Sequence, residues 1–121
     1  MATLGQSFPR ASRLLTGHEF SRVFDENRRK SSTRYALLLA LETQQPQSRL
    51  GLVIAKKNIR FANQRNRVKR IVREYFRCNP LSSSYDLVFL ARRGLGDLSN
   101  EQIRAQLNEL WRKLDKPSRV Q

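Results

Sequence analysis

Basic side chains recur every four residues in one segment of this 121-residue chain, at Arg65, Lys69, Arg73 and Arg77. In an α-helix, residues four apart are surface neighbours, and a pair of like charges there destabilises an isolated helix by about 0.2–0.5 kcal/mol. Glu74 is the only acidic residue among them. Phosphate groups would offset this repulsion, so the spacing indicates a helix that binds a polyanion. The alternative is an ordinary solvated helix face, although such faces usually mix charges of both signs.

The positive charge of the whole chain is concentrated in the same region. The chain has 24 Lys and Arg residues against 10 Asp and Glu residues, for a formal net charge of +14. Residues 56–77 hold nine basic residues and one acidic residue, so they contribute +8 of that total. A focused patch of this size indicates nucleic acid as the first partner to consider and an anionic membrane surface as the second. A generic surface bias is the least favoured interpretation.

Several classes of protein are excluded by scarce residue types. His18 is the only histidine and Cys78 the only cysteine, which excludes a zinc site, an intramolecular disulfide and a nuclease that uses a pair of histidines. We expect His18 at the surface or in a helix cap, and Cys78 as a small packing residue. The apolar run at 35–41 is far shorter than the roughly 20 residues of a membrane span, and no signal peptide is expected. A cytoplasmic protein without membrane association is therefore predicted.

Three helices are expected, and two of them begin at capping boxes. A helix at 17–24 follows Thr16, and another helix follows Ser99. Residues 63–77 are expected to form the basic helix. Its apolar positions share one arc that should dock on a sheet and turn the cations outward. These positions are Val68, Ile71, Val72, Tyr75 and Phe76.

Three apolar segments are expected to be strands, at 35–42, 50–55 and 85–91. The first two should pair as a hairpin across the turn-rich stretch between them. The third should be buried on both faces, because four apolar side chains follow one another in its middle. The order of these elements indicates one α/β domain over residues 1–121, built of a sheet and helix layers, with a disordered tail at 116–121.

A specific motif links the end of the second expected strand to the basic helix. Lys56-Lys57 ends the strand, Arg65-Asn66-Arg67 opens the helix, and Arg73-Glu74 follows further on. This arrangement resembles the signature of the bacterial ribonuclease P protein subunit. Residues 13–24, 50–55 and 86–94 resemble other segments of that family in the same order, so the likeness extends over about residues 8–114. Residues 58–64 depart from the Gly-Asn-Ala form of many members.

The resemblance implies a fold that the residue pattern alone does not give. It implies an α+β sandwich with the order αβββαβα, like the second domain of ribosomal protein S5. The sheet would be mixed, with a left-handed βαβ crossover. Parallel crossovers are right-handed in about 98% of cases, so the pattern by itself would predict the opposite hand.

The resemblance also implies a function. Members of the family are subunits of ribonuclease P, a ribonucleoprotein endonuclease that removes the 5′ leader from precursor tRNA. Catalysis would reside in the RNA subunit with Mg²⁺, which the RNA and substrate would mainly hold. The protein would be a monomer in a 1:1 complex, with no catalytic residue and no direct metal ligand of its own.

Two sets of contact residues follow from the resemblance. One set would hold the catalytic RNA: Lys56, Lys57, Arg60, Arg67 and Arg70. The other would bind the single-stranded leader in a cleft between the first helix and the sheet: Phe8, Arg13, Phe20, Phe24, Tyr35, Arg65, Asn66, Lys69 and Arg73. Basic grooves beside exposed aromatic rings are typical of single-strand binding, and each stacked base contributes about 1–3 kcal/mol. For Phe20 and Phe24, ordinary core packing of the first helix is the alternative.

Other functions are compatible with the basic helix. One is a non-enzymatic RNA-binding module, such as a ribosomal protein. Another is a DNA-binding domain that uses 63–77 as a recognition helix, although base recognition usually mixes Asn, Gln and Ser with Arg. Membrane binding is third, because the apolar face of the helix is needed by the core.

Overall fold

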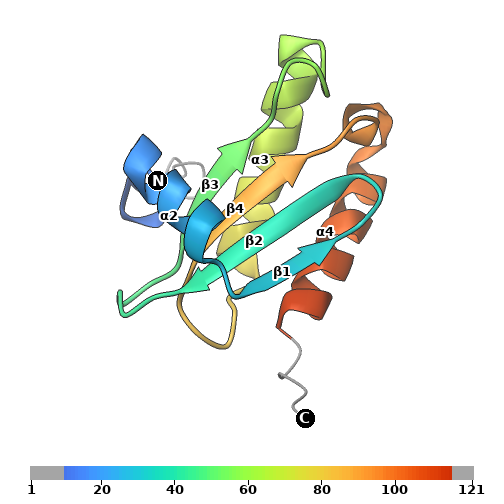
Figure 1. Cartoon of the computed structure of the whole chain (residues 1–121). Helices are drawn as coiled ribbons and strands as arrows, with labels where there is room; N and C mark the ends of the chain where they lie inside the picture. Colours follow the sequence, from blue (N-terminus) through green and yellow to red (C-terminus); the bar gives the residue numbers. More distant parts are fainter. Residues whose placement is uncertain (1–9, 116–121) are drawn as a thin grey trace, which may run out of the picture.

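The computed structural model describes residues 10–115, and a four-stranded mixed sheet lies at its centre (Figure 1). The strand order is β1-β2-β4-β3. β1 pairs antiparallel with β2, β2 pairs antiparallel with β4, and β3 pairs parallel with β4. The strands are β1 (Arg29–Ser32), β2 (Ala36–Glu42), β3 (Arg49–Val53) and β4 (Tyr85–Ala91). The predicted tail at 116–121 and the predicted site residue Phe8 lie outside the described residues.

Helices cover both faces of this sheet. The helices are α2 (Gly17–Glu26), α3 (Ala62–Cys78) and α4 (Asn100–Leu114), with two short 3₁₀ turns, η1 (Arg10–Ser12) and η2 (Leu95–Asp97). Figure 1 shows α2 in front of the sheet and α3 and α4 behind it. The order αβββαβα expected from the resemblance is confirmed.

The predicted hairpin between the second and third strands is wrong. β4 lies between β2 and β3 and is their common neighbour, antiparallel to the first and parallel to the second. The physical reason is that six of the seven β4 residues are buried, so the strand needs partners on both edges and layers on both faces. α3 joins β3 to β4 behind the sheet, which makes the βαβ crossover left-handed, against the usual preference (Figure 1).

β1 was not visible in the residue pattern, because its sequence Arg-Lys-Ser-Ser is polar. Tertiary contacts with the end of α4 hold it in the sheet. The hydroxyl of Ser31 donates to the Leu110 carbonyl at 2.9 Å, and Nη1 of Arg29 donates to the Leu114 carbonyl at 2.9 Å. The bond to Leu114 satisfies a carbonyl group that the last turn of a helix leaves without an intrahelical partner, and the bond to Leu110 adds a hydrogen bond to a carbonyl one turn earlier.

The helix starts agree with the sequence, whereas other details differ. Both capping boxes form, at Thr16 and at Ser99. α2 continues two residues beyond the predicted end at 24 and stops where the Asn27 side chain donates to the carbonyls of Val23 and Phe24. Cys78, expected to be a packing residue, is exposed at the C-terminal end of α3.

Two apolar clusters lie on opposite faces of the sheet. The larger one fills the space between the sheet and α3 with α4, and includes Trp111, whose ring meets Tyr75 edge-on at 5.0 Å between centroids. The smaller one lies under α2 and contains Leu14, Val23, Leu39 and Val88. In the described part of the chain, no helix has both the length and the apolar character needed to cross a membrane.

Candidate nucleic-acid interface

The apolar arc of α3 docks on the sheet as the sequence predicts. Val68, Ile71 and Val72 are buried, and Tyr75 and Phe76 pack partly buried against the same cluster. The opposite face of the helix therefore carries the basic residues. Asn66, Arg70 and Arg77 are exposed, while Arg65, Lys69 and Arg73 are partly buried along its flank.

The loop between β3 and α3 presents a second group of cations. Asn58 donates its side-chain amide to the Ala91 carbonyl at 3.0 Å, and Ile59 is 2% exposed beneath Gly96. These two contacts anchor the loop from inside and leave Lys56, Lys57 and Arg60 exposed.

An exposed aromatic ring lies in the same loop. Phe61 is 57% exposed, and the guanidinium of Arg60 lies 5.5 Å from its ring centroid. Phe61 was not among the predicted site residues. An aromatic residue beside a cation, directly before a basic helix, is the signal in the sequence that could have pointed to it.

Arg65 and Arg67 also hold the protein together. Nη1 of Arg65 donates to the carbonyls of Ile59 and Arg60 at 3.0 and 2.9 Å, which fixes the loop to the first turn of α3. The guanidinium of Arg67 donates to the carbonyls of Gly96 and Leu98, at 2.9 and 3.0 Å, and to the Asn100 side chain at 2.7 Å. It therefore joins α3 to the turn that opens α4. A role for either residue in binding RNA stays a prediction, and any such role would be additional to these contacts.

Two arginines distant in sequence are electrostatically coupled at the edge of the sheet. Arg13 forms a parallel bridge with Leu50, and the backbone amide of Leu14 donates to the Leu50 carbonyl at 3.1 Å. This places the N-terminal segment along the free edge of β3. Partial burial lowers the pKa of Arg73, and the positive charge of Arg13 lowers it further. An anion between these two guanidinium groups would be attracted by both.

The three predicted stacking residues do not form one group. The Phe20 ring packs on β3 over Gly51, where an added Cβ would overlap it, and is partly buried against the smaller cluster. Phe24, one turn further along α2, is 43% exposed. Tyr35 packs instead against the larger cluster beside Gly94, with the Arg34 guanidinium 5.5 Å from its ring centroid. Phe20 is thus partly a core residue, whereas Phe24 presents its ring to solvent.

An ion network fixes the position of α2, and the sequence analysis missed it. Nε and Nη2 of Arg49 donate to the two carboxylate oxygens of Asp86 at 2.9 and 2.7 Å, and Nη1 donates to Glu19 at 3.0 Å. Asp86 is only 3% exposed. Hydrogen bonds from the Leu15 and Thr16 amides, together with Arg49, lower the pKa of Glu19, although burial opposes them. The network ties the first turn of α2 to β3 and β4.

Carboxylates are not gathered at the basic face. Glu74 is the only acidic residue of α3. Among residues 10–115, no group of three or more His, Cys, Asp and Glu side chains could hold one metal ion. The guanidinium and ammonium groups of this region can bind phosphate, and its exposed aromatic rings can stack on bases.

The fold and site together define a class of protein, a small and strongly basic α+β sandwich whose cations gather on one helix and the loop before it. The model of the Ribonuclease P family matches residues 8–115. The ribonuclease P protein component of Pseudomonas paraeruginosa is 46% identical over 112 residues, which cover 92% of this chain and 83% of that protein. That of Marinobacter nauticus is 42% identical over 113 residues, covering 93% and 86%.

Solved structures agree with these sequence relatives. The RNase P protein of Thermotoga maritima superposes with a TM-score of 0.71 at 31% identity, covering 83% of this chain and 96% of that one. The RNase P protein of Staphylococcus aureus superposes with a TM-score of 0.79, covering 88% and 100%, and at 23% identity it supports the fold alone. The chain belongs to the ribonuclease P protein family, whose members are subunits of the endoribonuclease that matures the 5′ ends of tRNA.

Proposed function

We propose that this chain is the RNA-binding subunit of a ribonuclease P holoenzyme and contacts both the catalytic RNA and the 5′ leader of precursor tRNA. The observation that carries the proposal is the coupled pair Arg13 and Arg73 beside α2. The sheet edge holds Arg13 and the helix α3 carries Arg73, so a phosphate group beside them would be attracted by both charges. The aromatic residues of α2 lie on the face of the sheet that this N-terminal segment borders.

The catalytic RNA would occupy the end of the molecule where α3 begins. Lys56, Lys57 and Arg60 on the anchored loop and Arg70 on the helix are all exposed there. A folded RNA presents many closely spaced phosphates, so a rigid cluster of cations releases counterions on binding and depends strongly on salt. Arg67 would add to this surface through the part of its guanidinium not engaged with the turn before α4.

The leader would lie along the flank of α3 and contact Arg65, Asn66, Lys69 and Arg73, the last of which lies within electrostatic reach of Arg13 in the N-terminal segment. Phe24 supplies an exposed ring on which a base can stack, and Phe20 supplies part of one. Tyr35 packs against the opposite cluster, so we do not assign it to the same stack. Single-strand sites commonly combine a basic track with such rings.

The chemical step would belong to the RNA. Within residues 10–115, Glu74 is the only acidic residue of the basic helix α3, and we propose that the RNA and the substrate hold the Mg²⁺. The contribution of the chain would be to neutralise phosphates and so lower the Mg²⁺ concentration that cleavage requires. We further propose a 1:1 complex of protein and RNA, located in the cytoplasm.

The test combines the purified chain, a bacterial ribonuclease P RNA and precursor tRNA at low Mg²⁺. Leader removal is followed with protein alone, RNA alone and both together. Cleavage in the mixture and in neither separate reaction is the expected result. Tight binding to the RNA without stimulated cleavage would contradict the proposal and favour a general RNA-binding module.

A further inference from the structure

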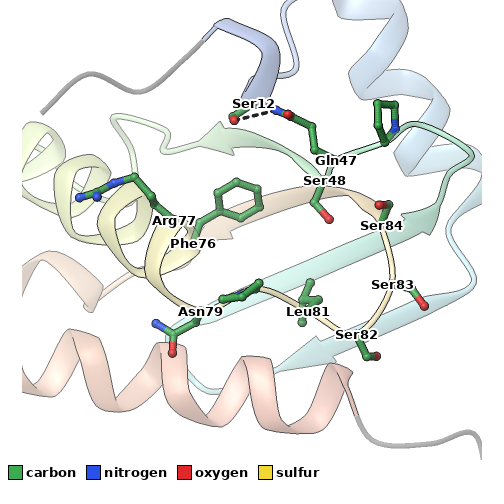
Figure 2. Close-up of a pocket in the computed structure, with 12 residues that line it drawn as sticks. Ser12, Gln47, Ser48, Phe76, Arg77, Asn79, Leu81, Ser82, Ser83 and Ser84 are labelled. Carbon is green, nitrogen blue, oxygen red and sulfur yellow. Dashed lines mark hydrogen bonds between the residues drawn. The ribbon is translucent and has the colours of Figure 1, made fainter. Parts of the chain in front are cut away.

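A cavity lies at the C-terminal end of α3, and none of the functions discussed above uses it. Its volume is about 460 Å³, within the range of small-molecule sites. Four segments line it: the η1 turn, the loop from β2 to β3, the end of α3, and the serine-rich loop before β4. Figure 2 shows these segments converging around it, with the Gln47 side chain donating to the Ser12 hydroxyl at 3.1 Å across one side.

The walls of the cavity differ in chemistry. The Phe76 ring points from α3 toward Ser48 (Figure 2), and Pro80 and Leu81 form further apolar wall. Ser48 and Ser84 bring hydroxyl groups to the other side. The Ser48 hydroxyl already accepts from the Tyr85 amide, at 2.9 Å. Within residues 10–115 the Ser84 hydroxyl has no hydrogen-bond partner, so it remains able to bind a ligand.

One charged side chain, that of Arg77, lies at the rim of the cavity. Arg77 lines the cavity, and in Figure 2 its side chain extends outward from the end of α3. In the part of the chain that the structure describes, its guanidinium has no ion-pair or hydrogen-bond partner. A planar apolar group could therefore enter between the walls while an attached anion remained at the rim beside Arg77.

The cavity continues the track of cations on α3. Arg77 follows Arg73 by four residues, slightly more than one helical turn and about 6 Å along the axis. Ser12 in the cavity wall directly precedes Arg13. The cavity is therefore adjacent to Arg13 through Ser12 and to Arg73 through Arg77. An RNA strand whose phosphates bind Arg13 and Arg73 could extend from there into the cavity.

We propose that this cavity receives one unpaired nucleotide, with its base against Phe76 and the apolar wall, its polar edge at Ser84, and its phosphate at Arg77. The inference rests on the proposed function, because an RNA must first bind the basic track. The nucleotide could come from the leader or from an unpaired position of the catalytic RNA. The chemistry is the same for both sources, and binding measurements separate them.

The test uses the holoenzyme and two variants of the cavity. Ser84→Phe fills it, and Arg77→Ala removes the rim charge. Arg104→Ala is the matched control, because it removes one exposed arginine from α4, outside the cavity. Dissociation constants are measured for precursor tRNA with a long leader, for mature tRNA, and for the catalytic RNA alone. Thermal unfolding verifies that each variant folds.

A loss of affinity of about fivefold or more that is confined to the leader-bearing RNA would support the inference, with the leader as the source of the nucleotide. The same loss on the catalytic RNA would support it with that RNA as the source. Losses no larger than those of Arg104→Ala on all three RNAs would overturn the inference. If Ser84→Phe fails to fold, Arg77→Ala and the shift of the Ser84 amide resonance on titration with a single-stranded pentanucleotide decide the question. Stimulation of cleavage by the unaltered chain reports on the proposed function separately.

Discussion

Replacing Arg73 by glutamine tests the role of the coupled arginine pair most directly. The substitution removes the charge that Arg13 faces, while a polar side chain of moderate length remains on the flank of α3. A hydrogen bond to a charged group contributes about 1.5–3 kcal/mol, which corresponds to about a 10-fold to 150-fold loss of affinity. We expect a loss in this range for precursor tRNA and nearly none for mature tRNA.

The salt dependence gives a second, independent magnitude. Each phosphate neutralised on a single strand contributes about 0.7 to the slope of log K against log salt concentration. Arg73→Gln should therefore reduce that slope by about 0.7 for the leader-bearing RNA. Removing one of two coupled cations weakens the site for the other, so the double change Arg13→Gln with Arg73→Gln should cost less than the sum of the single changes.

The assay is equilibrium binding to the reconstituted complex over a series of salt concentrations, with precursor and mature tRNA in parallel. Arg104→Gln on the exposed face of α4 is the control for loss of one charge. Equal losses for the two tRNAs, or a slope unchanged from the parent protein, would refute the assignment of this pair to the leader.

Three further outcomes are expected. Asp86→Asn should destabilise the fold by about 3–5 kcal/mol, because it breaks a buried ion pair with Arg49. Chemical denaturation measures the free energy of unfolding, and a change below about 1 kcal/mol would contradict the role of the network. The folded-state pKa of Glu19 is lowered, so the stability that ionised Glu19 contributes is complete above the unfolded-state pKa and is lost as the pH falls through the folded-state pKa. Glu19→Gln should therefore make the free energy of unfolding fall less steeply at acidic pH. An unchanged dependence on acidic pH would contradict this role of Glu19. Phe24→Ala should weaken leader binding by about 1–3 kcal/mol and change stability by less than about 0.5 kcal/mol, whereas Phe20→Ala should lower both; the reverse pattern in paired binding and melting experiments would assign Phe24 to the core.

Local features of the chain were predictable because they depend on neighbours in sequence. The capping boxes at Thr16 and Ser99 and the apolar arc of α3 follow from helical spacing alone, and all are present. The hairpin was wrong because strand pairing depends on where β4 inserts, which no local pattern encodes. β1 was missed because its stability comes from contacts between Ser31 and the end of α4.

The candidate site divides in the same way. The row of cations on α3 is visible in the sequence, since residues four apart share one side of a helix. The proximity of Arg13 to Arg73 is not visible in the sequence, because it requires the N-terminal segment to lie along β3. The internal contacts of Arg67 and the separation of Tyr35 from Phe20 likewise appear only when distant segments are packed together.

The sequence by itself thus determined the composition, the concentration of charge on α3, the places where the helices begin and, through its motifs, the family. The tertiary structure decided the strand order, the hand of the crossover, which aromatic rings remain exposed, and the cavity at the end of α3. The physical reason is that helix propensity, capping and charge spacing are short-range properties of the chain. Burial and proximity depend on how the sheet assembles from segments far apart in sequence.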